Sequence, residues 1–430
     1  MLRILKNTTI ILFTISLLST KCFAVTTQVH LTGLSTTAIN TASTIFVYPN
    51  AGGGGSTTET NRVFPSPTEG NITYLKACLT VDPANGAGVQ SVSFTARVAS
   101  ADSSTTCTVT EGDSDLCCES TTASAYTAGQ LLSLEVTPAN TPTAANFTTV
   151  IHTQDSTDKK TFYGSNGNGN VSNSATNYQA FVPGSNPQTD ENMAQVPIPY
   201  DFTATALYCQ SMFGSPGTGN SYTMAVVHNG STVGTLTCAI SGTGTTCNDT
   251  TNTFTGSAGD TLSVEIIPAS TPTARPIACG VALTNTGGGF MLAGGQSANY
   301  ADALNTYYHP LSGPFSYSTT EGDRTQKISA VTLKAAYGDL FVAPDNGALT
   351  QSYTYTVRDD AGATGCSFVI SEAAVSGSDT ACTDVIAVDS DIGYELVPSL
   401  IPAATGGWVS VWGILTTEDT AVSRRRWDIS

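Results

Sequence analysis

The chain has 430 residues, of which only 11% are charged, and its 16 basic and 33 acidic residues give a net charge of −17. This acidic balance excludes nucleic acid and an anionic membrane surface as expected partners, because proteins bind either of them through clusters of Lys and Arg. The scarcity of Lys, Glu and Arg beside 40 Gly excludes a coiled coil, and a hydrophobic content of 40% suits a large folded core.

Residues 1–24 are predicted to be a signal peptide. The segment begins with the basic Arg3 and Lys6, continues with a short apolar run and ends in small residues at Ala24. The alternative is a lipid anchor on Cys22, from which the sequence departs because a lysine precedes that cysteine. No later stretch has the roughly 18 uncharged apolar residues of a membrane-spanning helix. We therefore expect a secreted protein that is extracellular or held at a cell surface.

Internal repetition is the strongest feature of the remaining chain. The stretch AGQLLSLEVTPANTPTA begins at Ala128, and AGDTLSVEIIPASTPTA begins at Ala258 with 11 of 17 positions identical. A weaker copy lies at 394–399. The spacing predicts three modules of about 130 residues each. We place them at residues 25–155, 156–285 and 286–430, the last with a short basic C-terminal tail.

Within each module the landmarks follow one order. The aromatic clusters that end in proline lie at residues 46–49, 181–183 and 307–310, and the acidic turns that follow are assigned to Thr68-Glu69, Asp190-Glu191 and Thr320-Glu321. Short runs rich in Val, Thr, Tyr and Phe come next, often alternating with polar residues, which is typical of half-buried strands. Asn-Gly pairs at 229–230 and 346–347 predict hairpin turns. Seven or eight such strands per module predict an all-β chain of three tandem antiparallel β-sandwich, jelly-roll-like modules.

One turn and the strand after it carry a resemblance to a known family. The Ala-Gly-Asp turn at 258–260, followed by Leu262 and Val264, resembles the C1q/TNF-like jelly roll, and such modules are similar to those of bacterial, spore and phage surfaces. The first copy departs from the motif with Gln130, and the third departs further with Asp-Ser-Asp at 389–391. Modules of this family commonly associate as trimers around an apolar axis. The resemblance therefore implies a pseudo-trimer within one chain, and the alternative is a linear array.

Apart from Cys22, the chain has ten cysteines, an even number typical of an exported disulfide framework. Each module has a pair around a predicted hairpin: Cys107 with Cys117 or Cys118, Cys238 with Cys247, and Cys366 with Cys382. The remaining cysteines are expected to bond inside their own modules, Cys78 with Cys118 and Cys209 with Cys279. The third module has Ala336 near the place of Cys78 and Cys209, so it lacks a second bridge. We expect all ten cysteines to be oxidised.

Few residue patterns favour metal binding or catalysis. No C-x2-C pair occurs, and the histidines are scattered at His30, His152, His228 and His309, which disfavours a zinc site and a hydrolase triad. Acidic turns offer calcium as an alternative to plain solvated turns, with Asp113, Asp115, Asp389 and Asp391 as the candidate ligands. We expect no enzyme, and no cofactor other than calcium.

Six glutamates recur as two per module, one in each of two landmarks, which is typical of a structural role. They are Glu69, Glu191 and Glu321 in the acidic turns, and Glu135, Glu265 and Glu395 in the repeated strand. We expect them to cap backbone N–H groups or to pair at a turn, rather than to form the carboxylate pair of a glycoside hydrolase.

The C-terminal part adds two aromatic features. Trp408 and Trp412 fall on one face of a strand, which favours core or intermodule packing over sugar stacking. The run Arg-Arg-Arg-Trp at 424–427 is interpreted as a solvated tail, and docking on an acidic neighbour is the alternative. Together these features predict a disulfide-stapled structural or adhesive surface protein whose partner is another surface component. The alternative is a carbohydrate-binding, lectin-like protein assisted by calcium.

Overall fold

The computed structural model describes residues 28–418 with short gaps. The gaps are at 36–37, 40, 50–54, 87, 156–158, 166–168, 183–185, 286–288, 297–304, 315–316, 329, 342, 345–350, 361, 372–373, 388–389 and 400–409. The predicted signal peptide, the Asn-Gly pair at 346–347, Asp389, Trp408 and the basic run at 424–427 lie outside the described residues. Within them the fold is all-β, as predicted, and no helix is long and apolar enough to cross a membrane.

The described strands form six sheets, which fall into three pairs along the chain. The first sheet pair comprises β1 (Gln28–Ser35), β2 (Ile45–Val47), β3 (Phe64–Pro65), β4 (Gly70–Leu79), β5 (Ser91–Val98), β6 (Ala101–Thr110), β7 (Cys117–Ser120), β8 (Ser124–Tyr126), β9 (Leu131–Ala139) and β10 (Phe147–Asp155). The second comprises β11 (Lys159–Ser165), β12 (Asn177–Ala180), β13 (Val196–Pro197), β14 (Phe202–Ser211), β15 (Gly217–His228), β16 (Ser231–Gly242), β17 (Thr246–Asp249), β18 (Phe254–Gly256), β19 (Thr261–Ala269) and β20 (Ile277–Thr284).

The third sheet pair follows the same plan with one additional short strand. It comprises β21 (Phe290–Gln296), β22 (Tyr307–His309), β23 (Gly313–Pro314), β24 (Gln326–Lys327), β25 (Val331–Leu340), β26 (Ser352–Asp359), β27 (Gly362–Ser371), β28 (Ser376–Asp379), β29 (Val385–Ile386), β30 (Asp391–Pro398) and β31 (Ser410–Glu418). Each sheet pair also has one 3-10 turn among its described residues: η1 (Glu59–Asn61), η2 (Glu191–Met193) and η3 (Glu321–Asp323).

The three sheet pairs share one strand order. One sheet of each pair runs β1-β10-β4-β7, β11-β20-β14-β17 or β21-β31-β25-β28, and the other runs β2-β9-β5-β6, β12-β19-β15-β16 or β22-β30-β26-β27. The described pairings are antiparallel apart from a short parallel contact between β21 and β23. The first two pairs have ten described strands instead of seven or eight, because short β3, β8, β13 and β18 continue interrupted strands. The shared order lets equivalent residues be identified from their cross-strand partners.

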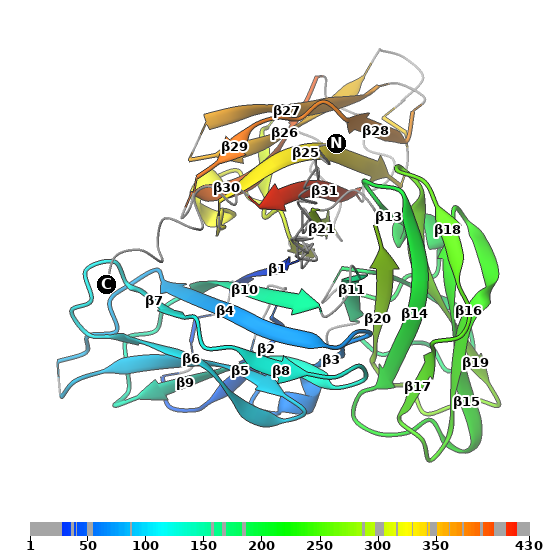
Figure 1. Cartoon of the computed structure of the whole chain (residues 1–430), viewed down its shortest axis with the longest axis horizontal. Helices are drawn as coiled ribbons and strands as arrows, with labels where there is room; N and C mark the ends of the chain where they lie inside the picture. The colour runs from blue at the N-terminus through cyan, green and yellow to red at the C-terminus, as the bar shows by residue number, and fades with distance from the viewer. Residues whose placement is uncertain are drawn as a thin grey trace, which may run out of the picture.

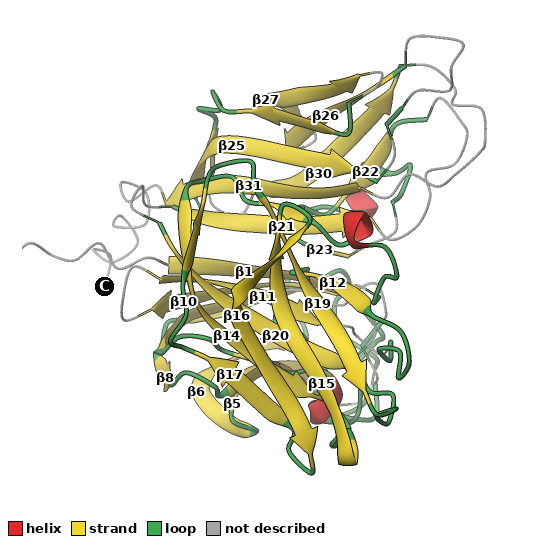
Figure 2. Cartoon of the chain, turned by 90° about the vertical axis from the view of Figure 1, so that its right-hand side faces the viewer, coloured by secondary structure: helices red, strands yellow, loops and turns green. Residues whose placement is uncertain are grey.

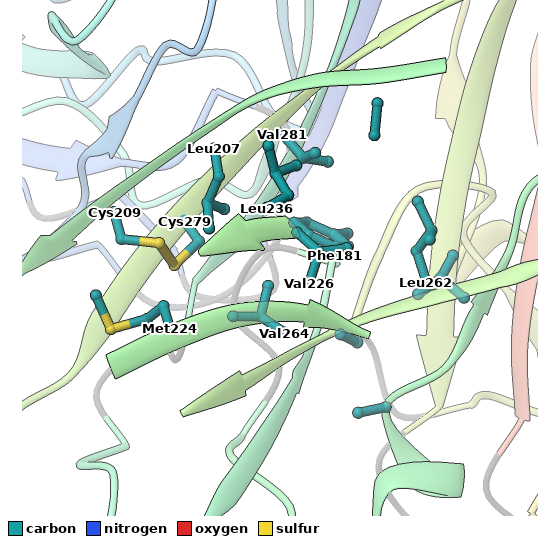
Figure 3. Close-up of a cluster of buried hydrophobic side chains, with 14 of the residues drawn as sticks. Phe181, Leu207, Cys209, Met224, Val226, Leu236, Leu262, Val264, Cys279 and Val281 are labelled. Carbon is teal, nitrogen blue, oxygen red and sulfur yellow. A yellow bond between two sulfur atoms is a disulfide. The ribbon is translucent and has the colours of Figure 1, made fainter. Parts of the chain in front are cut away.

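Alternating side chains explain why these segments pair as half-buried strands. In β5, Val92, Phe94 and Ala96 are buried, whereas the intervening Ser93 and Thr95 are partly exposed. The buried residues of the two sheets in each pair form one hydrophobic core. In the second pair, Leu207 and Val281 of one sheet face Val226 and Val264 of the other (Figure 3). Full burial of each such side chain contributes about 1.5–3 kcal/mol.

The sheet pairs are arranged around a common centre. Figure 1 shows the sheets that contain β4, β14 and β25, here called the inner sheets, turned toward that centre. The sheets that contain β5, β15 and β26, the outer sheets, face away from it. Strands β1 and β21 contact each other near the centre in both views (Figure 1, Figure 2).

Contacts between the sheet pairs follow one rule around the ring. Strand β3 lies against β11, β14 and β20; β13 lies against β25 and β31; and β24 lies against β1 and β10. The first pair thus contacts the second, the second contacts the third, and the third returns to the first. The described chain closes a ring rather than forming a linear array.

The hydrophobic cores continue across two of these junctions. Met212 and Ala278 of the second sheet pair belong to the core of the first, and Met291 of the third belongs to the core of the second. At the junction of the second and third pairs, a Cβ atom on Gly413 would lie 2.2 Å from the carbonyl oxygen of Pro197. Only glycine permits this close approach of two backbones.

The repeated Ala-Gly turn also lies at a junction. Gly129 and Gly259 have φ values of 84° and 92°, a conformation that favours glycine. A Cβ atom on Gly129 would lie 3.2 Å from the ring of Tyr208, and one on Gly259 would lie 3.2 Å from the ring of Tyr337. The same turn therefore makes the same contact with the following sheet pair twice.

The predicted hairpin at 229–230 is confirmed. Asn229 and Gly230 join β15 to β16 with φ values of 49° and 73°. The equivalent turn between β5 and β6 uses Ala99 and Ser100 with φ values of 51° and 62°. Because neither residue favours positive φ, the sequence carried no signal for this second hairpin.

Candidate functional site

The solvent side of the first outer sheet carries a cluster centred on Arg97. Its Nε donates to Glu59 Oε1 at 2.8 Å and its Nη1 donates to Glu135 Oε2 at 2.6 Å, with a further ion pair to Asp102. The guanidinium lies over the ring of Phe46, 5.4 Å from its centroid. Partial burial acts to lower the pKa of Arg97, but the hydrogen bond and charge of Glu59, with the charges of Glu135 and Asp102, raise it. The cluster therefore holds a charged guanidinium between carboxylates and an aromatic ring.

The third outer sheet has the same arrangement around Arg358. Its Nε donates to Glu321 Oε1 at 2.9 Å and its Nη1 donates to Glu395 Oε2 at 3.3 Å. The hydrogen bond that Arg358 donates to Glu321 raises the pKa of Arg358 against the opposing effect of burial. Tyr308 takes the place of Phe46, because it pairs with Glu395 in the sheet as Phe46 pairs with Glu135.

The second outer sheet has the equivalent carboxylates without the arginine. The strand register places Val227 where the other sheets have Arg97 and Arg358. Its side chain is 2% exposed and carries no charge. Glu191 begins η2 as Glu59 begins η1, and Glu265 lies on β19 beside Tyr178.

Neutral donors contact these two carboxylates. Gln195 Nε2 donates to Glu191 Oε1 at 3.1 Å, and Thr232 Oγ1 donates to Glu265 Oε2 at 3.0 Å. The hydroxyl of Tyr178 also lies 3.5 Å from Glu265 Oε1. Partial burial and the nearby charge of Glu265 raise the pKa of Glu191, although the bond from Gln195 opposes the shift. Hydrogen bonds thus satisfy the carboxylates, but in the described part of the chain no cation offsets their charge.

The acidic turn assigned to the first module was wrong. The residue equivalent to Glu191 and Glu321 is Glu59, since each begins a 3-10 turn, whereas Glu69 lies just before β4. We expected these glutamates to cap backbone N–H groups or to pair at a turn. Glu59 and Glu321 do form ion pairs, but each pairs with an arginine on a strand. Sequence reasoning missed both arginines because only two of three copies have one. A basic residue at the same place in two repeated strands was the available signal.

The ten described cysteines form five disulfides. They are Cys78–Cys117, Cys107–Cys118, Cys209–Cys279, Cys238–Cys247 and Cys366–Cys382. The expected Cys78–Cys118 bond is wrong, because Cys78 lies directly opposite Cys117 in the register of β4 and β7, with a Cα–Cα distance of 4.1 Å. Cys118 then bonds Cys107, one of the two partners that the sequence left open for it.

The place of the second bridge in the third sheet pair is Gly338 rather than Ala336. Gly338 pairs with Gly377 and Trp412 as Cys209 pairs with Cys247 and Cys279. The ring of Phe368 fills the space above both glycines. A Cβ atom would lie 2.7 Å from that ring on Gly338 and 2.9 Å from it on Gly377.

The described calcium candidates each have a partner within the protein. Asp113 Oδ2 accepts from the backbone N–H of Thr110 at 2.7 Å, and Asp391 pairs with Lys327 at 2.9 Å. Asp115 Oδ1 lies 3.5 Å from the backbone nitrogen of Cys117. Asp389 is outside the described residues. Calcium binding at these turns stays a prediction.

Among the described residues, one group of three metal-ligating types comes together, at Cys366, Asp379 and Cys382. Its two sulfur atoms are bonded to each other, which leaves a single carboxylate as a donor. Zinc is held by four donors in a structural site and by three in a catalytic site, so this group does not provide one.

The histidines are distributed over separate strands. His30 lies on β1 opposite His152 of β10 in the register. His228 Nε2 lies 2.7 Å from Asp260 Oδ2 on the second outer sheet. His309 is fully buried on β22, and its burial, with the charge of Arg324, lowers its pKa to about 3.

Trp412 packs in the hydrophobic core, as predicted. Its side chain is 1% exposed, and its Nε1 donates to the carbonyl oxygen of Leu311 at 2.9 Å. It contacts the rings of His309 and Tyr394 at centroid distances of 5.3 and 5.1 Å. This tryptophan offers no face to a sugar.

No protein-family model matches the chain, and no curated protein matches it. Its function is therefore inferred from its sequence and geometry.

Proposed function

We propose that the chain is a secreted structural or adhesive component of a cell or particle surface, with no catalytic site. In this proposal it consists of three C1q/TNF-like jelly-roll modules at residues 25–155, 156–285 and 286–430, closed into a pseudo-trimer. The closed ring of contacts from β3, β13 and β24 carries the proposal. Covalent linkage of the modules makes their association intramolecular, so the ring persists at any dilution.

The strand order supports the jelly-roll assignment. If β2 with β3 and β7 with β8 are each counted as one interrupted strand, the first sheet pair has eight strands, A to H. Its sheets then run A-H-C-F and B-G-D-E. Two four-stranded sheets with this connectivity are what a jelly roll requires.

The disulfides support export and a structural role. The five bonds among the described residues are typical of an oxidising compartment, as outside the cell. Each constrains the unfolded chain and so resists unfolding and proteolysis. Among the described residues one short strand of each outer sheet (β3, β13 or β24) lies against the inner sheet of the next pair, and the rest of each outer sheet faces away from the centre, where another surface component can contact it. A surface scaffold needs both properties.

Labelling of intact cells tests the proposal. Antibody against the folded chain is applied to producing cells or particles before and after permeabilisation, with a cytoplasmic protein as the control. We expect equal labelling in both states and recovery of the chain with other surface proteins after mild cross-linking. Labelling that requires permeabilisation contradicts the proposed location, turnover of a substrate contradicts the absence of catalysis, and specific binding on a glycan array supports the carbohydrate-binding alternative.

A further inference from the structure

The second outer sheet presents an aromatic ring and two carboxylates in an arrangement that elsewhere in this chain holds a guanidinium. Tyr178, Glu191 and Glu265 are equivalent to Phe46, Glu59 and Glu135, which surround Arg97. They are also equivalent to Tyr308, Glu321 and Glu395, of which the two glutamates form ion pairs with Arg358. Two equivalent carboxylates, with an aromatic residue beside one of them in the sheet, therefore bind a guanidinium at two of the three places.

A buried hydroxyl gives a second, independent observation. Ser263 is fully buried, and its Oγ has no hydrogen-bond partner. It lies opposite Val227 and two residues before Glu265, so it is on the same face of the sheet as both. In the first sheet pair the equivalent Ser133 Oγ donates to Glu59 Oε1 at 2.7 Å, next to the guanidinium. A buried hydroxyl without a partner costs free energy, which binding of a ligand at this place can recover.

We propose that Tyr178, Glu191 and Glu265 form a receptor site for the guanidinium group of an arginine side chain supplied by a partner polypeptide. The planar guanidinium donates to the two carboxylates and lies over the aromatic ring, as Arg97 does over Phe46 at 5.4 Å. Val227 has no donor to offer the two carboxylates, which are partly exposed on the solvent side. The ammonium of lysine lacks the planar fork, so arginine is favoured over lysine.

The chain itself contains one source of such a side chain. Arg424, Arg425 and Arg426 form its one run of three basic residues, in a sequence with 33 acidic residues. A second copy of the chain can supply this run, and so can an unrelated partner with an exposed arginine. The chemistry of the site is the same in both cases.

Calorimetric titration of the full mature chain with N-acetyl-arginine amide tests the site. We expect saturable binding that weakens at least tenfold in Glu191→Gln and Glu265→Gln. Val227→Leu is expected to bind like the unaltered chain, whereas Val227→Arg supplies the guanidinium internally and is expected to abolish binding while raising the melting temperature. Glu135→Gln, at the place that Arg97 already occupies, is the matched control and is expected to bind normally.

Two results would overturn the proposal. One is that the original chain does not bind the analogue, or that Glu191→Gln and Glu265→Gln bind it as tightly as the original chain does. The other is equal affinity for N-acetyl-lysine amide, which would show a site for cations of any kind. Thermal unfolding of each variant establishes that it is folded before titration.

A peptide of residues 421–430 distinguishes the sources of the arginine. Binding tighter than that of the single amino-acid analogue, lost when its three arginines are replaced by lysine, supports a second copy of the chain. Affinity no higher than that of the analogue supports a different partner protein.

Discussion

The second and third sheet pairs stabilise one place in the fold by different means. In the second pair, Cys209 of β14 bonds Cys279 of β20. In the third, Gly338 and Trp412 stand at these positions, and Phe368 covers the glycine. The ring of Tyr355 lies 5.1 Å from that of Phe368 and 5.4 Å from that of Tyr394, measured between centroids. The ring of Tyr394 in turn contacts Trp412. The comparison teaches that packed aromatic rings can take the place of the disulfide bond where a glycine, which has no side chain, leaves room for a ring.

Replacing Trp412 is expected to have the largest effect. Trp412→Ala leaves a cavity and an unpaired buried carbonyl at Leu311, which together cost about 5 kcal/mol of unfolding free energy. Denaturant unfolding measures the loss, with Trp412→Phe as a control that keeps a ring and costs less. A loss below about 2 kcal/mol would show that the aromatic cluster does not take the place of the bond.

Removing the Cys209–Cys279 bond is expected to cost slightly less. The bond closes a loop with a sequence separation of 70, for which chain entropy gives about 4 kcal/mol. The matched control is the Cys238–Cys247 bond in the same sheet pair, with a separation of 9 and an expected cost of about 3 kcal/mol. Double alanine variants of each pair, compared by denaturant unfolding, check this order. A larger loss from the shorter loop would contradict it.

Acid is expected to destabilise the third sheet pair through His309. Its pKa is about 3 in the folded protein and 6.5 in the unfolded chain, so between these values only the unfolded chain binds the proton. The stability from neutral His309 is complete above pH 6.5 and is lost as the pH falls, by about 3 kcal/mol at pH 4.5. Unfolding at pH 8 and pH 4.5 measures this difference. It should shrink in His309→Val, but persist in His228→Gln, which removes a partly exposed histidine.

The smallest effect is expected at Gln179, and it is a gain. Val47, Gln179 and His309 are equivalent, because they pair with Leu134, Val264 and Tyr394 in the three outer sheets. Both polar atoms of the buried Gln179 side chain are without a hydrogen-bond partner. Gln179→Val removes that cost and is expected to raise the unfolding free energy by about 1–2 kcal/mol. Destabilisation would show that the amide has a partner, such as a buried water.

Repetition made the fold predictable from the sequence. Strands, hairpin cysteines and the Ala-Gly turn recur at about 130 residues, and each recurrence supports the others. The partners of Cys117 and Cys118 were harder to predict, because these two cysteines are neighbours in one strand and lie near the same hairpin. Only the strand register decides which of them faces Cys78 and which bonds Cys107. Glu59 was missed because the first copy has a glutamate at 69 that also fits an acidic turn.

The candidate site was less predictable than the fold. It depends on a difference between copies, Val227 against Arg97 and Arg358, whereas a search for repeats selects what copies share. The ring of contacts was implied by the family resemblance, but the contacts of β3, β13 and β24 that close it come from short strands with no pattern of their own.

Small-angle X-ray scattering of the mature chain tests the closed ring most directly. A compact particle of this length has a radius of gyration of about 22 Å, and we expect a value near it. Gly413→Ala, which forces a Cβ atom against Pro197 at one junction, is expected to increase it. A value above about 30 Å for the unaltered chain, as for three modules in a row, would contradict the closed ring.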